Sequence, residues 1–195
     1  MAKNIEARII IVLVIIIAVL IIFTTFFKHD LKESTAIEFV MKDLQAKYPN
    51  GEVEVLSVTT VENGATGKYY EIKAKATEDA QSKCPIRTHI YYNYPTQNFV
   101  QQAPEYLTKG CRVCTKGPCV IAFPEEAIIA SHTLSGSEGM NKFLEFNPSA
   151  IPVAKENEDK WVVVWGSAYS NTQYVVEVSK NGKILAGQEI EKPAS

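Results

Sequence analysis

The chain has 195 residues and a formal net charge of −2 at pH 7. Hydrophobic residues make up 46% and charged residues 22%, which are globular values and exclude disordered and collagen-like chains. With 20 basic and 22 acidic residues the chain has no basic surplus, so we expect no nucleic-acid partner. The length leaves room for one ordinary domain, or two small ones, after an apolar N-terminal segment.

The apolar segment covers residues 9–27, which contain no charged side chain. A helix of this length spans roughly 28 Å, close to the thickness of the hydrocarbon core of a bilayer. The segment is longer than the apolar core of a signal peptide, and no small-x-small cleavage site ends it. We therefore expect an uncleaved signal anchor that crosses the lipid bilayer once. A pilin-like helix is disfavoured, because Glu6 precedes the run and no Gly processing site stands before it.

The charges that flank this segment are nearly balanced, since Lys3 and Arg8 precede it and Lys28 and Lys32 follow it. With the amino terminus counted, the positive-inside rule favours a cytoplasmic N-terminus. All four cysteines follow the segment, and an even number of cysteines in an exported chain indicates an oxidising compartment. The predicted organisation in the cell membrane is a cytoplasmic N-terminus (1–8), a transmembrane signal anchor (9–27), a linker (28–34) and an extracytoplasmic domain (35–195).

The first half of this domain, residues 35–94, has the pattern of a helix followed by three strands. Thr35 and Glu38 have capping-box spacing, apolar residues then recur at helical intervals, and Pro49 stops the helix. The second strand alternates apolar and charged residues, which predicts an antiparallel sheet with one wet face. Leu56 interrupts the alternation of the first strand and indicates a β-bulge there. Strands are expected over residues 52–61, 68–77 and 86–94.

Residues 95–123 contain several prolines and glycines that break any long element, and they hold three of the four cysteines. We expect a loop-rich insertion that disulfides hold in place. A bridge from Cys84 to the segment 111–119 would tie this insertion to the sheet.

The second half, residues 124–190, repeats the order of helix and strands. Pro124 and two following glutamates predict a short helix that ends at His132. A second capping box begins at Ser135 and precedes a short amphipathic helix that ends near Asn147. Strands are expected over residues 150–154, 161–165, 174–179 and 183–189, the last two joined by an Asn181-Gly182 hairpin turn.

The predicted fold class is α+β, with one N-terminal transmembrane helix and an antiparallel-sheet ectodomain made of two helix-plus-meander units. The two units would reflect an internal duplication. One curled antiparallel sheet that carries both helices accounts equally well for the same elements.

The last strands resemble those of a known family. Trp161-Val-Val-Val-Trp165 and, after a polar turn, Tyr174-Val-Val-Glu-Val-Ser-Lys-Asn-Gly-Lys-Ile-Leu185 are similar to the terminal strands of PepSY domains. The resemblance implies a small cystatin-like unit outside the cytoplasm, linked to the membrane, that inhibits peptidases or binds ligands at the cell surface. It implies no functional residue, because the matching positions are strand core and turn.

The four cysteines form the cluster with the most chemical content, and three uses of it stay open. Structural disulfides fit the expected compartment and allow three pairings. A metal site would use four thiolates. However, the chain has a single C-x-x-C motif, whereas a strong zinc-binding pattern has two such pairs. A redox centre would use Cys111-x-x-Cys114, although glycine and proline surround that motif. The disulfide candidates, and the ligands of the metal alternative, are Cys84, Cys111, Cys114 and Cys119.

No other constellation indicates catalysis. The three histidines fall beside the membrane (His29), on the polar side of a strand (His89) and at a helix end (His132). Glu125 and Glu126 are adjacent, so they point in different directions and do not make an acid–base pair. The sequence contains no phosphate loop, no H-E-x-x-H motif and no EF-hand loop. We therefore predict no catalytic residue, no cofactor and no metal ligand.

These patterns favour a membrane-anchored, non-catalytic extracytoplasmic domain that binds a protein or peptide partner at the cell surface. An exposed strand edge would dock the partner by strand addition. The alternative is a thiol–disulfide redox or metal-binding protein that uses the Cys111-x-x-Cys114 cluster.

Overall fold

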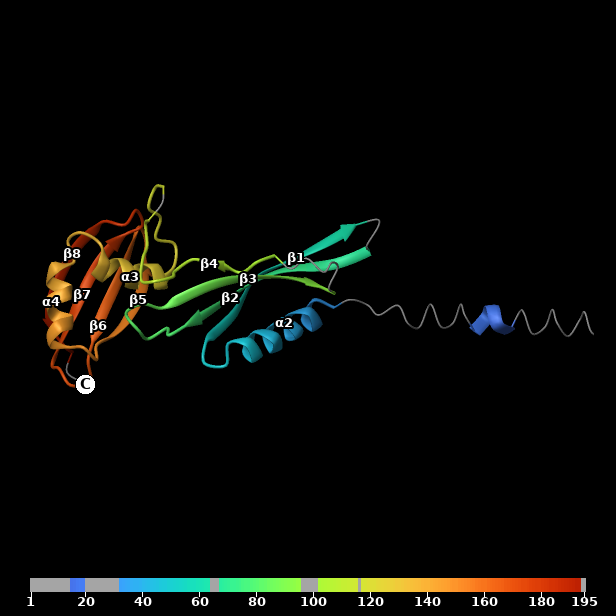
Figure 1. Ribbon diagram of the computed structural model, residues 1–195, viewed down its shortest axis with the longest axis horizontal. Helices are drawn as coiled ribbons and strands as arrows, with labels where there is room; N and C mark the ends of the chain where they lie inside the picture. Colours follow the sequence, from blue (N-terminus) through green and yellow to red (C-terminus); the bar gives the residue numbers. More distant parts are fainter. Residues whose placement is uncertain (1–14, 20–31, 64–66, 96–101, 116, 194–195) are drawn as a thin grey trace, which may run out of the picture.

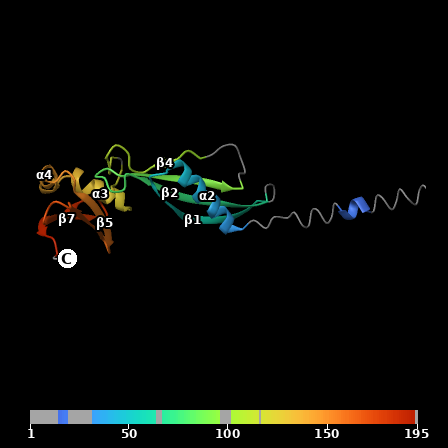
Figure 2. The ribbon, with the colours of Figure 1, turned by 90° about the horizontal axis from the view of Figure 1, so that it is seen from below.

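The computed structural model describes residues 15–19, 32–63, 67–95, 102–115 and 117–193. Within them the chain forms two four-stranded antiparallel sheets, the first with one helix and the second with two helices on one face (Figures 1 and 2). The predicted α+β class with antiparallel sheets is therefore confirmed. Two separate sheets are present, in the orders β1-β2-β3-β4 and β5-β6-β7-β8, and one curled sheet is not observed.

Every strand and helix expected after residue 34 is present, and β4 in the Cys-rich insertion is additional. The first unit contains α2 (Glu33–Lys47), β1 (Glu52–Asn63), β2 (Gly67–Glu78), β3 (Ile86–Tyr94) and β4 (Glu105–Tyr106). The second unit contains α3 (Pro124–Thr133), α4 (Glu138–Phe146), β5 (Ile151–Asn157), β6 (Lys160–Gly166), β7 (Thr172–Ser179) and β8 (Ile184–Glu191).

Helix α2 covers one face of the first sheet, where apolar residues of β2 and β3 alternate with polar ones (Figure 2). Burial of these side chains stabilises the unit by about 1.5–3 kcal/mol for each large aliphatic residue. The predicted capping box at Thr35 is wrong: the helix begins at Glu33, and the Thr35 N–H already donates to the Lys32 carbonyl within the first turn. The core of this unit comprises Ala36, Val40, Leu44, Tyr70, Ile72, Ala74, Ala76 and Ile90.

The predicted bulge at Leu56 is confirmed. Val55 pairs with Ala74 and Ser57 pairs with Lys73, so Leu56 has no partner in the ladder. Its side chain is exposed, and the extra residue restores the apolar alternation of β1 on the covered face.

Helices α3 and α4 cover one face of the second sheet, and two tryptophans of β6 fill the centre of that core. The Trp161 indole donates to the Ile121 carbonyl and the Trp165 indole donates to the Ser131 hydroxyl, at 3.0 Å in both cases. The predicted capping box at Ser135 is wrong. Gly136 has a φ of +96°, which a helix cannot accommodate, so α4 begins only at Glu138.

The hairpin turn at Asn181-Gly182 is present, but it is longer than the expected two residues. The Ser179 N–H donates to the Lys183 carbonyl at 2.8 Å across the turn. Gly182 has a φ of +77°, and a Cβ at this position would lie 2.2 Å from the Cys119 sulfur. Both the backbone angle and the close approach therefore require glycine.

Of the expected anchor, only residues 15–19 are described, and they are helical. Among the described residues no helix is both long enough and apolar enough to cross a bilayer. The other positions of the apolar run, 9–14 and 20–27, lie outside the described residues, so the anchor stays a prediction.

Candidate functional site

The two units meet at a buried ion pair between β3 and α3. Arg87 Nη1 donates to Glu125 Oε2 at 3.0 Å, and the Thr77 hydroxyl donates to Glu125 Oε1 at 2.7 Å. The guanidinium lies over the Phe123 ring, 3.6 Å from its centroid. Burial opposes ionisation of Glu125, but the Thr77 hydrogen bond and the Arg87 charge outweigh it and leave the pKa below its ordinary value. The pair is therefore charged, and it fixes the first unit against the second.

His89 lies beside this pair in the neutral form. Burial, together with the positive charges of Lys73 and Arg87, lowers its pKa to about 4. Arg87 Nε donates to His89 Nε2 at 3.2 Å, so the ring proton is on Nδ1. Among the described residues Nδ1 has no hydrogen-bond partner, and Glu105 Oε2 lies 3.9 Å away.

One face of the first sheet was expected to be exposed to solvent. At the end that contacts α3, this face is buried. Arg87 and His89 are each only 2% exposed, because Phe123 and the start of α3 cover them. Further along the same face, Glu71 and Asn93 are exposed as expected. No local pattern in β3 predicts this burial, because Phe123 and the start of α3, which cover Arg87 and His89, follow more than 30 positions later in the chain.

The four cysteines form two disulfides, Cys84–Cys111 and Cys114–Cys119, and the described residues include no free cysteine. The first bridge ties the insertion to the loop after β2, as expected. The two cysteines of the C-x-x-C motif belong to different bridges, so this motif is not a dithiol pair. Sulfurs in disulfides are not thiolates, so the four cysteines do not form the metal-ligand set of the alternative prediction.

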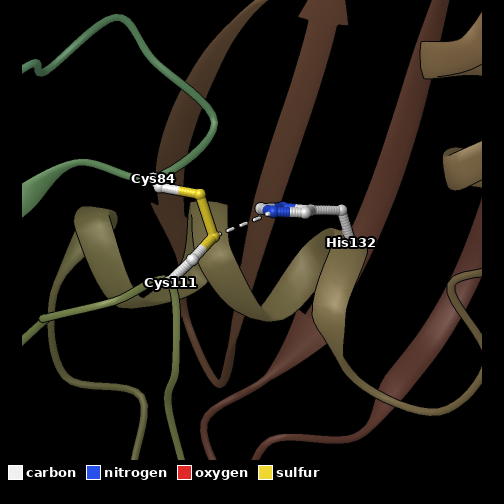
Figure 3. Close-up of side chains that lie close together, drawn as sticks. All are labelled: Cys84, Cys111 and His132. Carbon is white, nitrogen blue, oxygen red and sulfur yellow. Dashed lines mark hydrogen bonds between the residues drawn. A yellow bond between two sulfur atoms is a disulfide. The ribbon is translucent and has the colours of Figure 1, made fainter.

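His132 at the end of α3 points its ring at the first bridge (Figure 3). Nε2 lies 3.4 Å from Cys111 Sγ, and Nδ1 lies 3.0 Å from the Ile128 carbonyl oxygen. A carbonyl oxygen can only accept, so Nδ1 carries the proton of the neutral ring and Nε2 presents its lone pair to the sulfur. The sequence placed His132 correctly at a helix end but gave no sign of this contact.

The surroundings of His132 keep its ring neutral. Burial lowers its pKa, the hydrogen bond to Ile128 acts in the opposite direction, and the Lys83 charge lowers it further. The ring packs edge-on against Trp165 with 5.5 Å between centroids. The imidazole is thus held in one orientation and one tautomer beside the disulfide.

The second sheet has an open face, defined as the side opposite α3 and α4, where no described helix lies (Figure 2). The strand register places Val153 of β5 beside Val164 of β6, and Val164 beside Val175 of β7. Val153 is 64% exposed, and Lys155 stands next to it on the same face. Val153, Lys155 and Val164 line a groove of about 450 Å³, whose wall also includes Glu156, Asn157 and Val162.

Strand β5 is one of the two edge strands of this sheet. Pro152 fits there because an edge strand does not need every backbone donor. A second cavity of about 200 Å³ lies at the junction of the two units, between β5 and the buried Glu125. Val153 lines both cavities, so the concave surface continues along the edge strand.

Comparison with known proteins identifies no relative of this chain. No family model, no curated protein and no solved structure matches it. The resemblance to PepSY domains therefore stays a prediction.

Of the sequence-predicted candidates, Glu126 has a structural role, since its carboxylate accepts the N–H groups of Ala122 and Phe123 at the start of α3. It points away from Glu125, as expected. His29 lies outside the described residues. The groove beside β5 was not predicted residue by residue, but the β-branched residues at outward positions of β5 and β6 are its signal in the sequence.

Proposed function

We propose that this chain is a membrane-anchored, non-catalytic extracytoplasmic domain that binds an extended peptide segment of a partner protein along β5. The observation that carries the proposal is the apolar groove beside a free strand edge. An added strand would pair with the backbone of β5, and its alternate side chains would cover Val153 and Val164. Contiguous apolar surface of this kind, rimmed by polar residues, is typical of an interaction site.

The charges at the groove indicate which peptide it would prefer. Glu156 pairs with Lys180, whereas Lys155 makes no ion pair with any described residue. A carboxylate of the bound segment would supply the missing partner. The proposed occupant is therefore an extended segment in which apolar residues alternate with polar ones and which carries an acidic residue opposite Lys155.

The membrane location rests on the apolar run at residues 9–27 and on the two disulfides, which are typical of exported domains. The PepSY-like pattern of the last strands supports the same location. Alkaline extraction of membranes tests the anchor: the chain should stay in the membrane pellet. Release of the intact chain into the supernatant would contradict an anchor.

A peptide-binding assay tests the docking surface. We expect the full chain in detergent to bind extended decapeptides with alternating apolar residues, and acidic members of the set to bind more tightly than basic ones. Replacement of Val153 by Asp should weaken binding at least tenfold, because it places a charge in the apolar groove. Lys155→Glu should reverse the charge preference of the bound peptides.

The matched control is Leu185→Asp on β8, an exposed apolar residue at the opposite edge of the same sheet. Leu185→Asp should bind peptides like the wild type. If Val153→Asp and Leu185→Asp weaken peptide binding equally, or if neither substitution changes it, β5 is ruled out as the docking edge.

A further inference from the structure

The Cys84–Cys111 bridge and His132 lie away from the groove of β5 and take no part in the proposed docking. Three separate parts of the chain bring them together: the loop after β2, the Cys-rich insertion and the end of α3. The two sulfurs and the ring nitrogen all lie within 4.8 Å of one another (Figure 3). Both cysteines are half-buried, so a small reagent can reach the bridge.

We propose that Cys84–Cys111 is a thiol–disulfide exchange site that accepts two electrons from a dithiol, with Cys111 as the leaving sulfur and His132 as the residue that holds its proton. Exchange is faster when the leaving thiolate is stabilised. Negative charge that develops on Cys111 Sγ lies 3.4 Å from His132 Nε2, which takes up a proton from solvent as that charge forms. Among the described residues no histidine nitrogen forms a hydrogen bond with Cys84 Sγ. Attack at Cys84 is therefore favoured.

The exchange transfers two electrons from the dithiol to the bridge. One thiolate of the dithiol bonds to Cys84 Sγ, the Sγ–Sγ bond breaks, and its electron pair goes to Cys111 Sγ. Cys111 takes a proton from His132 Nε2, which has drawn it from solvent. The second thiol of the reagent loses its proton to solvent and attacks its partner sulfur, which releases Cys84 as a thiolate that is then protonated. The dithiol is oxidised to a cyclic disulfide, and the two cysteines are reduced.

Burial and the Lys83 charge lower the pKa of His132 and keep its ring neutral while the bridge is intact, so Nε2 takes up a proton only as Cys111 Sγ becomes negative. The Ile128 carbonyl of its own helix holds Nδ1–H and leaves Nε2 free for the sulfur. Lys83, from the loop after β2, is the charged group that acts on the ring, and its positive charge also favours a thiolate nearby. Trp165 of β6 packs against the ring and adds no charge.

The second bridge of the same molecule is the internal control, because no described histidine contacts Cys114–Cys119. The full chain in detergent is treated with dithiothreitol, quenched by alkylation at intervals, and mapped by mass spectrometry of its peptides. We expect Cys84–Cys111 to open at least about tenfold faster than Cys114–Cys119. His132→Gln should remove most of that difference and leave the rate of Cys114–Cys119 unchanged. Equal opening rates of the two bridges in the wild type would overturn the proposal.

A second measurement separates proton holding from a purely structural role of His132. In the Cys84→Ser variant, ultraviolet titration of the free Cys111 thiol should give a pKa below the ordinary value of about 8.5. Adding His132→Gln should return the titration to about 8.5, while the Cys114–Cys119 opening rate reports that the fold is intact. A Cys111 titration that is the same with and without His132 would contradict the proposal.

Discussion

The two sheets are built on the same plan, but the faces that their helices leave uncovered differ. The uncovered face of the first sheet has a groove of about 340 Å³ lined by polar residues such as Ser57, Thr59, Glu71 and Lys73. The open face of the second sheet instead carries valines at successive paired positions. A polar face is stable in water alone, whereas an apolar face gains stability when a partner covers it. This contrast is the reason why the proposed peptide docking is placed on the second sheet.

The two units also end differently where they meet. The polar face of the first sheet becomes buried there and supplies Arg87, while the second unit supplies Glu125 from the first turn of α3, whose other buried residues are mostly apolar. Because the charged residues are paired across the junction, they determine how the two units are placed relative to each other.

The largest expected effect concerns the buried ion pair. Arg87→Ala should lower the free energy of unfolding by about 3–5 kcal/mol, because it leaves the Glu125 carboxylate buried without its charge partner. Lys73→Ala, on the same face of the sheet but half-buried, should cost less than about 1 kcal/mol. Urea denaturation of the two variants measures the difference. Equal losses of unfolding free energy would mean that the junction does not shield the Arg87–Glu125 pair from water.

The second prediction concerns pH. The pKa of His89 is lowered to about 4 in the folded chain and lies near 6.5 in the unfolded chain, so the unfolded chain binds more protons between these values. The free energy of unfolding should therefore fall as the pH drops from about 6.5 toward 4, by about 2–3 kcal/mol from this group. His89→Gln keeps an acceptor for Arg87 and should flatten that part of the curve. An unchanged slope in this variant would show that His89 does not control it.

The third prediction compares two hairpin glycines, one in each sheet. Gly67 and Gly182 have φ values of +79° and +77°, but of these two glycines only Gly182 would bring an added Cβ within 4 Å of another atom among the described residues. Gly67→Ala should cost about 1–2 kcal/mol for its backbone angle. Gly182→Ala should lower the free energy of unfolding by about 2 kcal/mol more than Gly67→Ala, because the added Cβ also collides with the Cys119 sulfur. Thermal unfolding of both variants measures the difference, and equal midpoints would contradict the contact with the disulfide.

The smallest expected effect concerns the open face. Val153→Asp should change the free energy of unfolding by no more than about 0.5 kcal/mol, because the side chain is already 64% exposed. Denaturation of the unbound variant checks this. A large loss of stability would mean that Val153 belongs to the core, and its effect on peptide binding would then need another explanation.

Much of the fold follows from local patterns in the sequence. Alternation in β2, the phase break at Leu56 and the Asn181-Gly182 turn each predicted a feature that the structure contains. Both predicted capping boxes were wrong, because backbone hydrogen bonds near Thr35 and the left-handed Gly136 set the helix starts instead. The disulfide pairing and the burial of Arg87 could not be predicted, since both depend on contacts between segments that are distant in the chain.

Hydrogen exchange of the full chain, with and without a bound decapeptide, shows which strand gains backbone hydrogen bonds from the peptide. Strand addition to the second sheet predicts slower exchange of alternate amides in β5 (Ile151–Asn157), because they gain backbone partners. The amides of β1, the corresponding edge of the first sheet, should exchange at the same rate in both states. Protection in β1, or bound peptide without any protection in β5, would contradict the account.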